Sequence, residues 1–336
     1  MCTRILWNTG EEQPVITARN MDWTSTMGDK LYVFPKGIKR NGLTDENPLT
    51  WTSKYGSLVN VSWDCATTDG LNEAGLAANA LYLAEAKWGD RDPSMPGLSI
   101  ALWCQYYLDT CATVAEVVEA AKKMQVRAIE LVHKGINVDS PIHLSVSDAS
   151  GDSAVIEILD GVPHIHHGRE YTTMTNSPVF EEQLVLLKQY DGLGGRLPIP
   201  GTLEAEDRFA RAAFYLTKVP SKPENYQEAV SNVLSVIRNA ATPYGANDPE
   251  RPNISATIWT TLADCTNKRF YFEFTNMPNI IWADLENFDL SEGSPIMMFE
   301  LKGNFEASGN VSGLFQKAEP VNFLKAGGVV TWKPTD

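Results

Sequence analysis

The stretch CTRILWNTGEEQPVITARNMDW (2–23) contains two short β-rich runs separated by a polar turn. Residues 3–9 (TRILWNT) and 14–19 (PVITAR) have the β-branched and aromatic content of strands, and GEEQ lies between them. The pattern therefore predicts that the two runs pair as neighbouring strands. Cys2 then stands at the start of the first of them.

Cys2 follows the initiator methionine directly. Once Met1 is removed, the Cys2 thiol shares its residue with a free α-amine, whose ordinary pKa is about 8. That amine can take the thiol proton, so that the nucleophile and its base come from one residue. The alternative is a cysteine that lies near the terminus without any chemical role, and its position alone does not exclude this.

Arg19 and Asp22 lie three residues apart in ARNMDW (18–23), on the segment expected to pair with the strand of Cys2. An arginine beside a thiol favours the thiolate. A carboxylate beside the α-amine can orient it through a charge-assisted hydrogen bond. The alternative is an exposed ion pair, which contributes little.

Two later segments place polar side chains at the ends of predicted elements. In TNSP (175–178), Asn176 follows a strand, where its amide can donate to an oxyanion or cap the next helix. In EAEDRFARAAFY (204–215), Arg208 and Arg211 lie three apart on a predicted helix. One of these arginines can point at a site while the other is solvated.

Blocks of strand-like and helix-like residues fill the rest of the chain. The strand-like runs are 30–35, 57–63, 75–83, 141–148, 153–160, 162–167, 171–175, 254–264, 269–276 and 295–301. The helix-like runs are 97–109, one that opens at Thr113 with Glu116 in a capping box, 179–190, 204–217 and 225–239. This order predicts an α+β fold of antiparallel sheets covered by helices. We expect residues 2–336 to form a single domain, with 191–201 as a surface loop.

Composition excludes several classes of partner. The 336 residues carry a formal net charge of −14, so no basic stripe exists for nucleic acid or for an anionic membrane surface. No apolar run approaches the roughly 20 residues that span a bilayer, and membrane insertion is not expected. The chain as written has no signal peptide, which predicts a cytoplasmic protein, or a periplasmic one if Met1 replaces a removed leader.

Neither a metal nor another cofactor is expected. The five cysteines include no C-x-x-C pair, and the odd count does not suggest a disulfide framework. His164, His166 and His167 have no obvious carboxylate partner nearby in the sequence. GLGG (192–195) lacks the Lys-Ser/Thr of a phosphate loop, and no G-x-S-x-G elbow occurs.

The residues discussed so far belong to a set of motifs that resembles the choloylglycine hydrolases, which include bile-salt hydrolases and penicillin V acylases. The resemblance covers nearly the whole chain. The matching pieces are Cys2, ARNMDW (18–23), WTSKYGS (51–57), TTDGLNEAGLAANALYL (67–83), SVSDASGDSAVIE (145–157), TNSP (175–178) and DRFARAAFY (207–215).

The resemblance implies a four-layer αββα sandwich of the N-terminal-nucleophile hydrolases, built on two antiparallel sheets. It implies that Cys2 is the nucleophile, that Arg19 holds its thiolate and that Asp22 orients the α-amine. It further implies that Asn176 donates to the oxyanion and that Arg208, in preference to Arg211, is the remaining charge of the site.

Departures from the gut bile-salt hydrolases bear on substrate and on assembly. Tyr82 stands where those enzymes carry an asparagine and penicillin V acylases an aromatic residue, and its backbone amide is expected to complete the oxyanion hole. Trp23 and Trp88 are similar to a tryptophan pair of the Gram-negative branch, whose members act on phenoxyacetyl amides and N-acyl homoserine lactones. Two indoles can form a flat apolar wall, although core packing is the alternative for each. The stretch between 178 and 207 is shorter than the hairpin that helps build the bile-salt hydrolase tetramer, which leaves a homotetramer open.

We therefore expect hydrolysis of a non-peptide carboxamide through a thioester on Cys2, of the penicillin V acylase or N-acyl homoserine lactone acylase type. A bile-salt hydrolase with the same machinery is the nearest alternative. A binding protein with an inert Cys2 is an alternative of another class.

Overall fold

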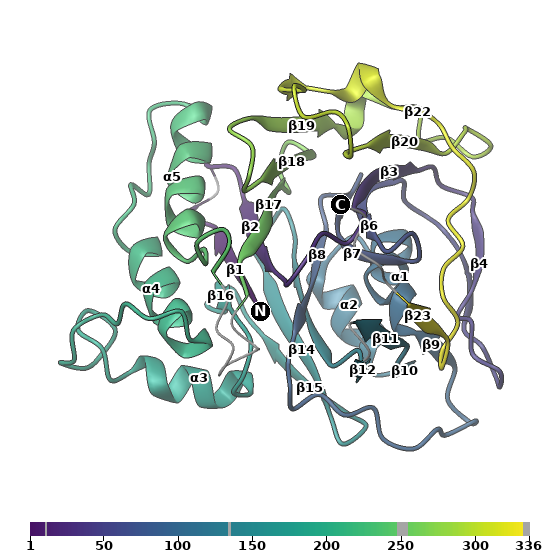
Figure 1. Ribbon diagram of the computed structural model, residues 1–336, viewed down its shortest axis with the longest axis horizontal. Coiled ribbons are helices and arrows are strands. Elements are labelled where there is room, and N and C mark those ends of the chain that lie inside the picture. The colour runs from purple at the N-terminus through teal and green to yellow at the C-terminus, as the bar shows by residue number, and fades with distance from the viewer. Residues whose placement is uncertain (11, 134–135, 247–254, 332–336) are drawn as a thin grey trace.

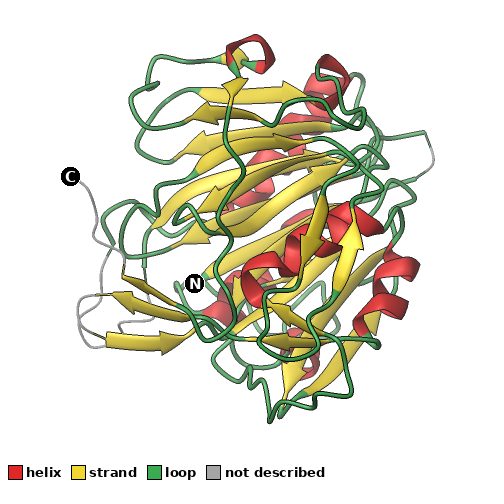
Figure 2. Cartoon of the chain, turned by 90° about the vertical axis from the view of Figure 1, so that its right-hand side faces the viewer, coloured by secondary structure: helices red, strands yellow, loops and turns green. Residues whose placement is uncertain are grey.

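The computed structural model describes residues 1–10, 12–133, 136–246 and 255–331. Two large sheets form its centre, and strands make up much of the chain (Figures 1 and 2). Sheet A consists, in spatial order, of β16 (Thr173–Met174), β1 (Cys2–Trp7), β2 (Ile16–Asp22), β17 (Thr257–Asp264), β18 (Arg269–Phe274), β19 (Ile280–Asp284) and β21 (Gly309–Asn310). Sheet B consists of β15 (Val162–His167), β14 (Ser153–Leu159), β13 (Ile142–Ser147), β8 (Ala77–Tyr82), β7 (Ala66–Asn72), β6 (Ser57–Ser62), β3 (Lys30–Phe34), β20 (Met297–Glu300) and β22 (Gln316–Lys317).

Neighbouring strands run antiparallel throughout sheet B and in sheet A up to β19. The short β21 joins β19 in parallel. The predicted pairing of the first two strands is confirmed, with Cys2 opposite Met21 in the register. The antiparallel α+β class predicted from the order of elements is confirmed as well.

Helices cover the outer face of each sheet (Figure 1). On sheet A lie α4 (Ala205–Leu216) and α5 (Tyr226–Asn239), and α3 (Phe180–Leu187) packs beside α4. On sheet B lie α1 (Trp103–Thr110) and α2 (Val114–Ala121). The four layers αββα follow, as the family resemblance implied.

Alternation along the strands explains these layers. In β1, Ile5 and Trp7 pack towards α4 and α5, whereas Cys2 and Leu6 pack into the core between the two sheets. Both faces of the strand are thus covered, and every residue of β1 is buried. The same period-two pattern carries Cys2 into the interior.

Three smaller strand groups complete the described chain. β9 (Gly97–Ser99) pairs with β10 (Gln125–Arg127), and β4 (Lys39–Asn41) with β5 (Thr50–Thr52). β11 (Glu130–His133) pairs with β12 (Ile136–Asp139) and with the C-terminal β23 (Val329–Thr331). Single-turn 3₁₀ helices cover Ile100–Leu102, Leu285–Asn287 and Ser312–Leu314.

Most predicted elements are found, and two details repay comparison. Thr113 caps α2 by accepting a hydrogen bond from Glu116 N at 3.3 Å, as the capping box predicts. The predicted helix at 97–109 is wrong at its start, because residues 97–102 form β9 and a 3₁₀ turn. The first residue of the predicted strand 254–264 lies outside the described residues. Among the described residues, no helix is long and apolar enough to cross a bilayer.

Candidate active site

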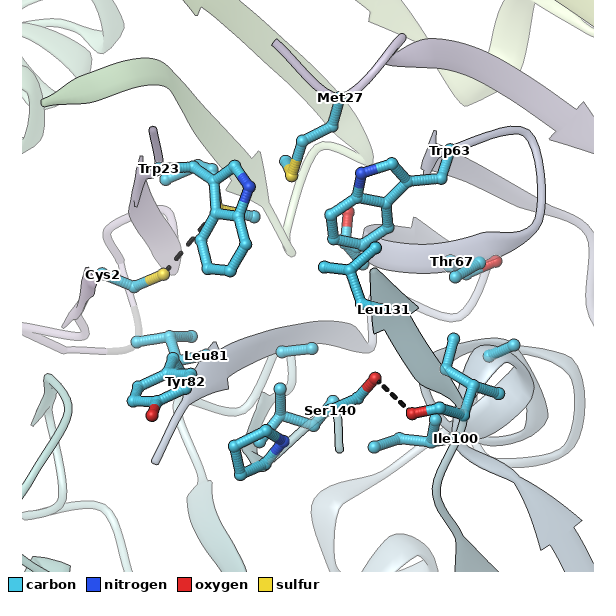
Figure 3. Close-up of a pocket in the computed structure, with 18 of the residues that line it drawn as sticks. Cys2, Trp23, Met27, Trp63, Thr67, Leu81, Tyr82, Ile100, Leu131 and Ser140 are labelled. Atoms are coloured by element: carbon cyan, nitrogen blue, oxygen red, sulfur yellow. Dashed lines mark hydrogen bonds between the residues drawn. The ribbon is translucent and has the colours of Figure 1, made fainter. Parts of the chain in front are cut away.

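The Cys2 side chain projects from β1 into the space between the sheets (Figure 3). There it is met by Arg19 of β2. Arg19 Nη2 lies 3.3 Å from Cys2 Sγ. The neighbouring Met21 Sδ lies 3.9 Å from the same sulfur. A guanidinium at this distance stabilises a thiolate, because it supplies both charge and a hydrogen-bond donor.

Arg19 is fixed from several sides. Its Nη1 pairs with Asp69 Oδ2 at 2.8 Å, and its Nη2 also donates to Ala80 O at 2.7 Å. The guanidinium carbon lies 4.6 Å from the centre of the Trp259 ring. Burial lowers the pKa of Arg19, but the attraction of Asp69 and of the Cys2 sulfur outweighs it and leaves the pKa above its ordinary value. Arg19 therefore stays charged at any pH of interest.

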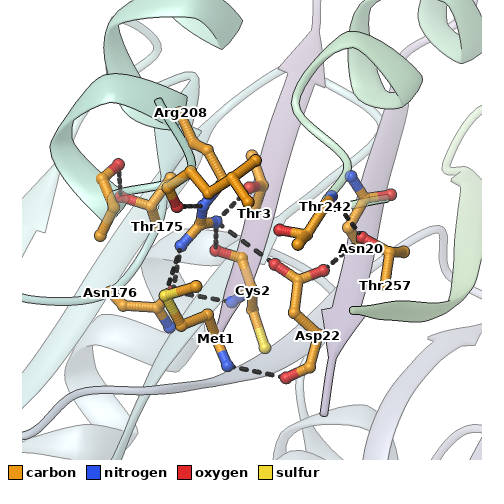
Figure 4. A network of polar contacts seen from close by, with 12 residues as sticks. Met1, Cys2, Thr3, Asn20, Asp22, Thr175, Asn176, Arg208, Thr242 and Thr257 are labelled. Atoms are coloured by element: carbon orange, nitrogen blue, oxygen red, sulfur yellow. Dashed lines mark hydrogen bonds and ion pairs between the residues drawn. The ribbon is translucent and has the colours of Figure 1, made fainter. Parts of the chain in front are cut away.

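The α-nitrogen side of Cys2 is held by Asn176 (Figure 4). Cys2 N donates to Asn176 Oδ1 at 2.7 Å, and Asn176 Nδ2 donates to Tyr82 O at 2.6 Å. Asn176 does not cap the next helix, since α3 begins after Val179 without a side-chain cap. Glu157 Oε1 instead accepts from Phe180 N at 3.0 Å. The helix-cap alternative for Asn176 is therefore wrong.

Arg208 links these groups from α4. Its Nη2 donates to Asn176 Oδ1 at 2.8 Å, and its Nη1 donates to Cys2 O at 2.6 Å and Thr3 Oγ1 at 2.7 Å. Burial lowers the pKa of Arg208. Arg211 contacts none of these atoms and donates to Thr202 O at 2.6 Å. Of the two arginines, only Arg208 reaches the α-nitrogen side of Cys2.

Asp22 lies on the other side of Arg208, with its Oδ2 3.5 Å from Arg208 Nη1. Its Oδ1 accepts from Thr257 Oγ1 at 2.5 Å, while Oδ2 has no hydrogen-bond donor within the described residues. Asp22 and Arg19 are both fully buried and do not pair with each other. The alternative of an exposed ion pair between them is therefore wrong.

Met1 is attached to Cys2 in this structure and lies in the same pocket of polar groups. It is only 5% exposed, and its ammonium donates to Asp22 O at 2.7 Å. Burial lowers the pKa of this ammonium. Arg208 Nη2 also lies 3.4 Å from Met1 Sδ. While Met1 is present, the nitrogen of Cys2 is an amide and cannot act as a base.

A narrow, mostly apolar pocket opens beside Cys2 Sγ (Figure 3). Its walls include Trp23, Met27, Trp63, Tyr82, Ile100 and Leu131. Trp23 and Trp63 meet edge to face, with ring centres 6.3 Å apart and an interplanar angle of 75°. Such a pocket suits an apolar or aromatic group of a ligand.

The predicted tryptophan wall is partly wrong. Trp23 lines the pocket, but Trp88 does not; it packs edge-on against Trp103 of α1, with ring centres 6.0 Å apart. Trp63 takes the second place. It ends a predicted strand and has a φ of 54°, which is rare for a bulky residue and which the sequence does not reveal.

Two further buried residues that contact the site were not predicted. Asp69 pairs with Arg19, and burial raises the pKa of Asp69 to about 6 despite that attraction. Thr257 donates to Asp22. Asp69 stands before Gly70, and Asp-Gly is typical of a turn, so the sequence pattern pointed away from a buried strand. Thr257 carries no signal beyond its place in a predicted strand.

Comparison with known proteins places these motifs in a family. The family model for linear amide C–N hydrolases, choloylglycine hydrolase family, matches residues 2–299. A penicillin V acylase from Pectobacterium atrosepticum is 40% identical over 96% of this chain and 92% of its own. The structure of penicillin V acylase from Agrobacterium tumefaciens matches with a TM-score of 0.87 at 45% identity, over 96% of this chain and 100% of that one. A bile salt hydrolase/transferase from Clostridium perfringens is 25% identical over 87% of this chain and 95% of its own.

Proposed function

The chain belongs to the choloylglycine hydrolase family of linear amide C–N hydrolases, and from this premise we propose that it is a penicillin V acylase-type enzyme with Cys2 as its nucleophile. The observation that carries the proposal is the apolar pocket, which begins at the sulfur that Arg19 contacts at 3.3 Å. We include N-acyl homoserine lactones as substrates, because their acyl chains suit the same walls. A bile salt is the second candidate. It ranks below penicillin V because the bile salt hydrolase relative is only 25% identical to this chain, whereas the penicillin V acylase relative is 40% identical.

The proposed acylation step uses the α-amine that Met1 removal frees. The thiol proton passes to this amine while sulfur attacks the amide carbonyl, and a C–S bond forms. The negative oxygen accepts hydrogen bonds from Asn176 Nδ2, which has a second proton besides the one given to Tyr82 O, and from the backbone N–H of Tyr82. The C–N bond then breaks, and the leaving amine takes the proton from the α-ammonium.

Deacylation reverses the use of the same groups. Water adds to the thioester carbonyl and gives a proton to the α-amine. The C–S bond breaks, the carboxylic acid leaves, and the proton returns to the Cys2 sulfur. Asp22 Oδ2, which lacks a donor among the described residues, is the acceptor that we assign to the liberated α-ammonium. We also propose that residues 2–336 act as one domain.

The test compares Cys2→Ala with Cys65→Ala in protein whose intact mass shows that Met1 is absent. Cys65 is a buried thiol of the outer core, and burial raises its pKa to about 12, so it is a matched inert cysteine. We expect Cys2→Ala to lower kcat by at least about 10⁴-fold and Cys65→Ala to keep it within a few-fold. Both variants and the wild type are assayed with penicillin V, glycocholate and a long-chain N-acyl homoserine lactone.

Each outcome decides between the alternatives. Turnover of penicillin V or the lactone that depends on Cys2 supports the proposal. A clear preference for glycocholate replaces it with a bile-salt hydrolase. Full activity in Cys2→Ala excludes the proposed nucleophile, and binding of all three compounds without turnover by the Met1-free wild type leaves a binding protein.

A further inference from the structure

A buried polar layer lies under the site, between the two sheets. It is built by side chains of sheet B that point towards sheet A, and each is less than about a tenth exposed: Asn60, Ser62, Thr68, Asp69 and Asn79, together with Asp29 from the β2–β3 connection. Buried carboxylates in such a place are costly unless they have partners. Two carboxylates, Asp29 and Asp69, therefore call for an explanation.

Asp29 is accounted for by neutral donors. Its Oδ1 accepts from Ser62 Oγ at 2.7 Å and from Asn60 Nδ2 at 2.9 Å, and its Oδ2 accepts from Trp259 Nε1 at 3.0 Å. These bonds tie sheet A to sheet B without touching Cys2. Asp29 thus has a structural role. Its hydrogen bond from Trp259 Nε1 also holds in place the ring that lies 4.6 Å from the Arg19 guanidinium carbon.

Asp69 is different, because it contacts the group that contacts the nucleophile. Its Oδ2 receives Arg19 Nη1 at 2.8 Å, and its Oδ1 receives Asn79 Nδ2 at 2.7 Å. Asn79 stands directly opposite Asp69 in the β7–β8 register. The carboxylate is therefore held by its neighbouring strand on one side and clamps the guanidinium on the other.

The position of Arg19 depends on this clamp. The guanidinium has one amine group, Nη2, directed at Cys2 Sγ and Ala80 O, while Nε has no partner among the described residues. Among the described residues, Asp69 is the one carboxylate that forms an ion pair with Arg19 at a distance of 4 Å or less. Moving the carboxylate consequently rotates the planar fork and carries Nη2 away from sulfur.

We propose that Asp69 is a positioning residue, which acts through Arg19 to set the distance of the guanidinium from Cys2 Sγ and the charge that the sulfur experiences. This rests on the proposed function of Cys2 as nucleophile. Asp69 neutralises part of the Arg19 charge, so that the thiolate is stabilised but remains reactive. A more strongly stabilised thiolate is a weaker nucleophile.

Charged groups on every side of the site contribute to the same balance. Arg19 and Asp22 face it from β2, Asp69 from β7 and Arg208 from α4, while Asp29 lies behind Trp259. The α-amine of Cys2 joins them once Met1 is gone. A test must therefore separate the charge of Asp69 from its geometry while leaving these groups unchanged.

Two substitutions make that separation, and both are measured on the full chain without Met1. Asp69→Asn keeps the shape and removes the charge; Asn79 Oδ1, which has no partner among the described residues, can then accept from the new amide. Asp69→Glu keeps the charge and displaces the carboxylate by one methylene. The first readout is the rate of Cys2 alkylation by iodoacetamide as a function of pH, measured by mass spectrometry. The second is kcat and KM for whichever of penicillin V, glycocholate and the N-acyl homoserine lactone the enzyme hydrolyses.

The matched controls are Asp109→Asn and Asp109→Glu. Asp109 is also fully buried and also pairs with an arginine at 2.8 Å, Arg40, and neither residue lines the pocket. These variants report what the loss of a buried pair does to the fold alone. Thermal unfolding of all four variants shows whether their losses of stability are comparable.

We expect Asp69→Asn to move the midpoint of the alkylation profile about one unit to lower pH, because an anion beside Arg19 is lost. We expect Asp69→Glu to move that midpoint to higher pH, because Arg19 Nη2 is carried away from the sulfur, and to lower kcat by about 10- to 100-fold with KM within about threefold, since a shift of about 1 Å at the reacting groups is enough. Neither Asp109 variant should change the midpoint, or kcat by more than about twofold.

An unchanged midpoint in Asp69→Asn, or wild-type kcat in Asp69→Glu, overturns the proposal. If one of the two variants does not fold, the other still decides, because each has its own readout. Alkylation needs no substrate, so a shifted midpoint in a protein that hydrolyses none of the three amides would contradict the proposed function and support the role of Asp69. Normal hydrolysis with unshifted profiles would do the reverse.

Discussion

An arginine–aspartate ion pair lies on the inner face of sheet B and another on its outer face, with the same N–O distance. Arg19 meets Asp69 at 2.8 Å between the sheets, and Arg40 meets Asp109 at 2.8 Å beneath the β4–β5 hairpin. Both carboxylates are fully buried. Only the inner arginine reaches a thiol, that of Cys2, and only it borders a pocket.

Tryptophan pairs repeat the contrast. Trp23 and Trp63 meet at 75° on the pocket side, and Trp88 and Trp103 meet at 83° in the outer core. The two pairs have nearly the same separation, 6.3 Å and 6.0 Å. Geometry within a pair therefore does not tell a functional pair from a structural one.

The two faces differ in the groups that surround each ion pair. Arg40 pairs with Asp109 and lies over the rings of Phe34 and Phe323, 4.7 Å and 5.2 Å from their centres, and it does not line the pocket beside Cys2. Arg19, in contrast, directs Nη2 at Cys2 Sγ and lines the pocket beside it. A buried ion pair alone is weak support for function; a buried pair next to a thiol and a cavity is much stronger.

The largest difference is expected when each arginine loses its charge. Arg19→Met should lower kcat/KM by about 10²- to 10³-fold, because the donor and charge beside Cys2 disappear. Arg40→Met should keep kcat/KM within about threefold and lower the unfolding temperature instead. Steady-state assays with whichever of the three amides the enzyme hydrolyses, together with thermal unfolding, check the expectations for the two variants. Equal losses of kcat/KM in the two variants would erase the functional distinction between the faces.

The sequence predicted the inner face only where its residues carry recognisable chemistry. Cys2, Arg19 and Asp22 lie in one hairpin, and Asn176 and Arg208 lie in motifs of their own. The fold brings all five together because β1, β2, the segment after β16 and α4 meet at this point. Runs rich in β-branched and aromatic residues, bounded by turns, also predicted most strands of both sheets.

The rest could not be predicted because the inner face is polar where a core is usually apolar. ATTDGLN (66–72) reads as a turn, with Thr-Thr and Asp-Gly, but forms the buried strand β7. Its Asp69 is satisfied by Arg19 and Asn79, which are 50 and 10 residues away in the chain. Trp88 was expected in the pocket from its similarity to a tryptophan pair of the Gram-negative branch, but the segment after β8 directs it to the outer core, which was the alternative.

A smaller difference is expected when a tryptophan is removed from each face. Trp63→Ala should raise KM for a phenoxyacetyl amide by about 10-fold, because a ring that lines the pocket is lost. Trp88→Ala should leave KM within about twofold and cost about 3–5 kcal/mol of unfolding free energy, since it empties a well-packed core position. KM values and urea unfolding curves distinguish them. A KM effect in Trp88→Ala that matches Trp63→Ala would return Trp88 to the pocket wall.

The smallest effect concerns stability against pH, and here the two faces should behave alike. Burial raises the pKa of Asp69 to about 6 and raises that of Asp109, so each folded carboxyl binds a proton more tightly than the unfolded one. For Asp69 the folded state carries the extra proton between about pH 4 and 6, and the stabilisation is full below this window and lost as pH rises through it; for Asp109 the loss has the same sign.

The free-energy advantage of the wild type over Asp69→Asn should therefore fall from pH 4.5 to pH 6.5, by at most about 1.4 kcal/mol per pH unit, and likewise over Asp109→Asn with the same sign. Urea unfolding at three pH values measures both differences, and groups common to wild type and variant cancel. A difference that grows with pH at Asp69 would mean that Arg19 outweighs burial there and lowers the pKa of the carboxyl. The two stability differences could fall with pH at the same rate while only Asp69→Asn shifts the alkylation midpoint. The two pairs would then be alike energetically, and the difference between the faces would lie in the chemistry of Cys2.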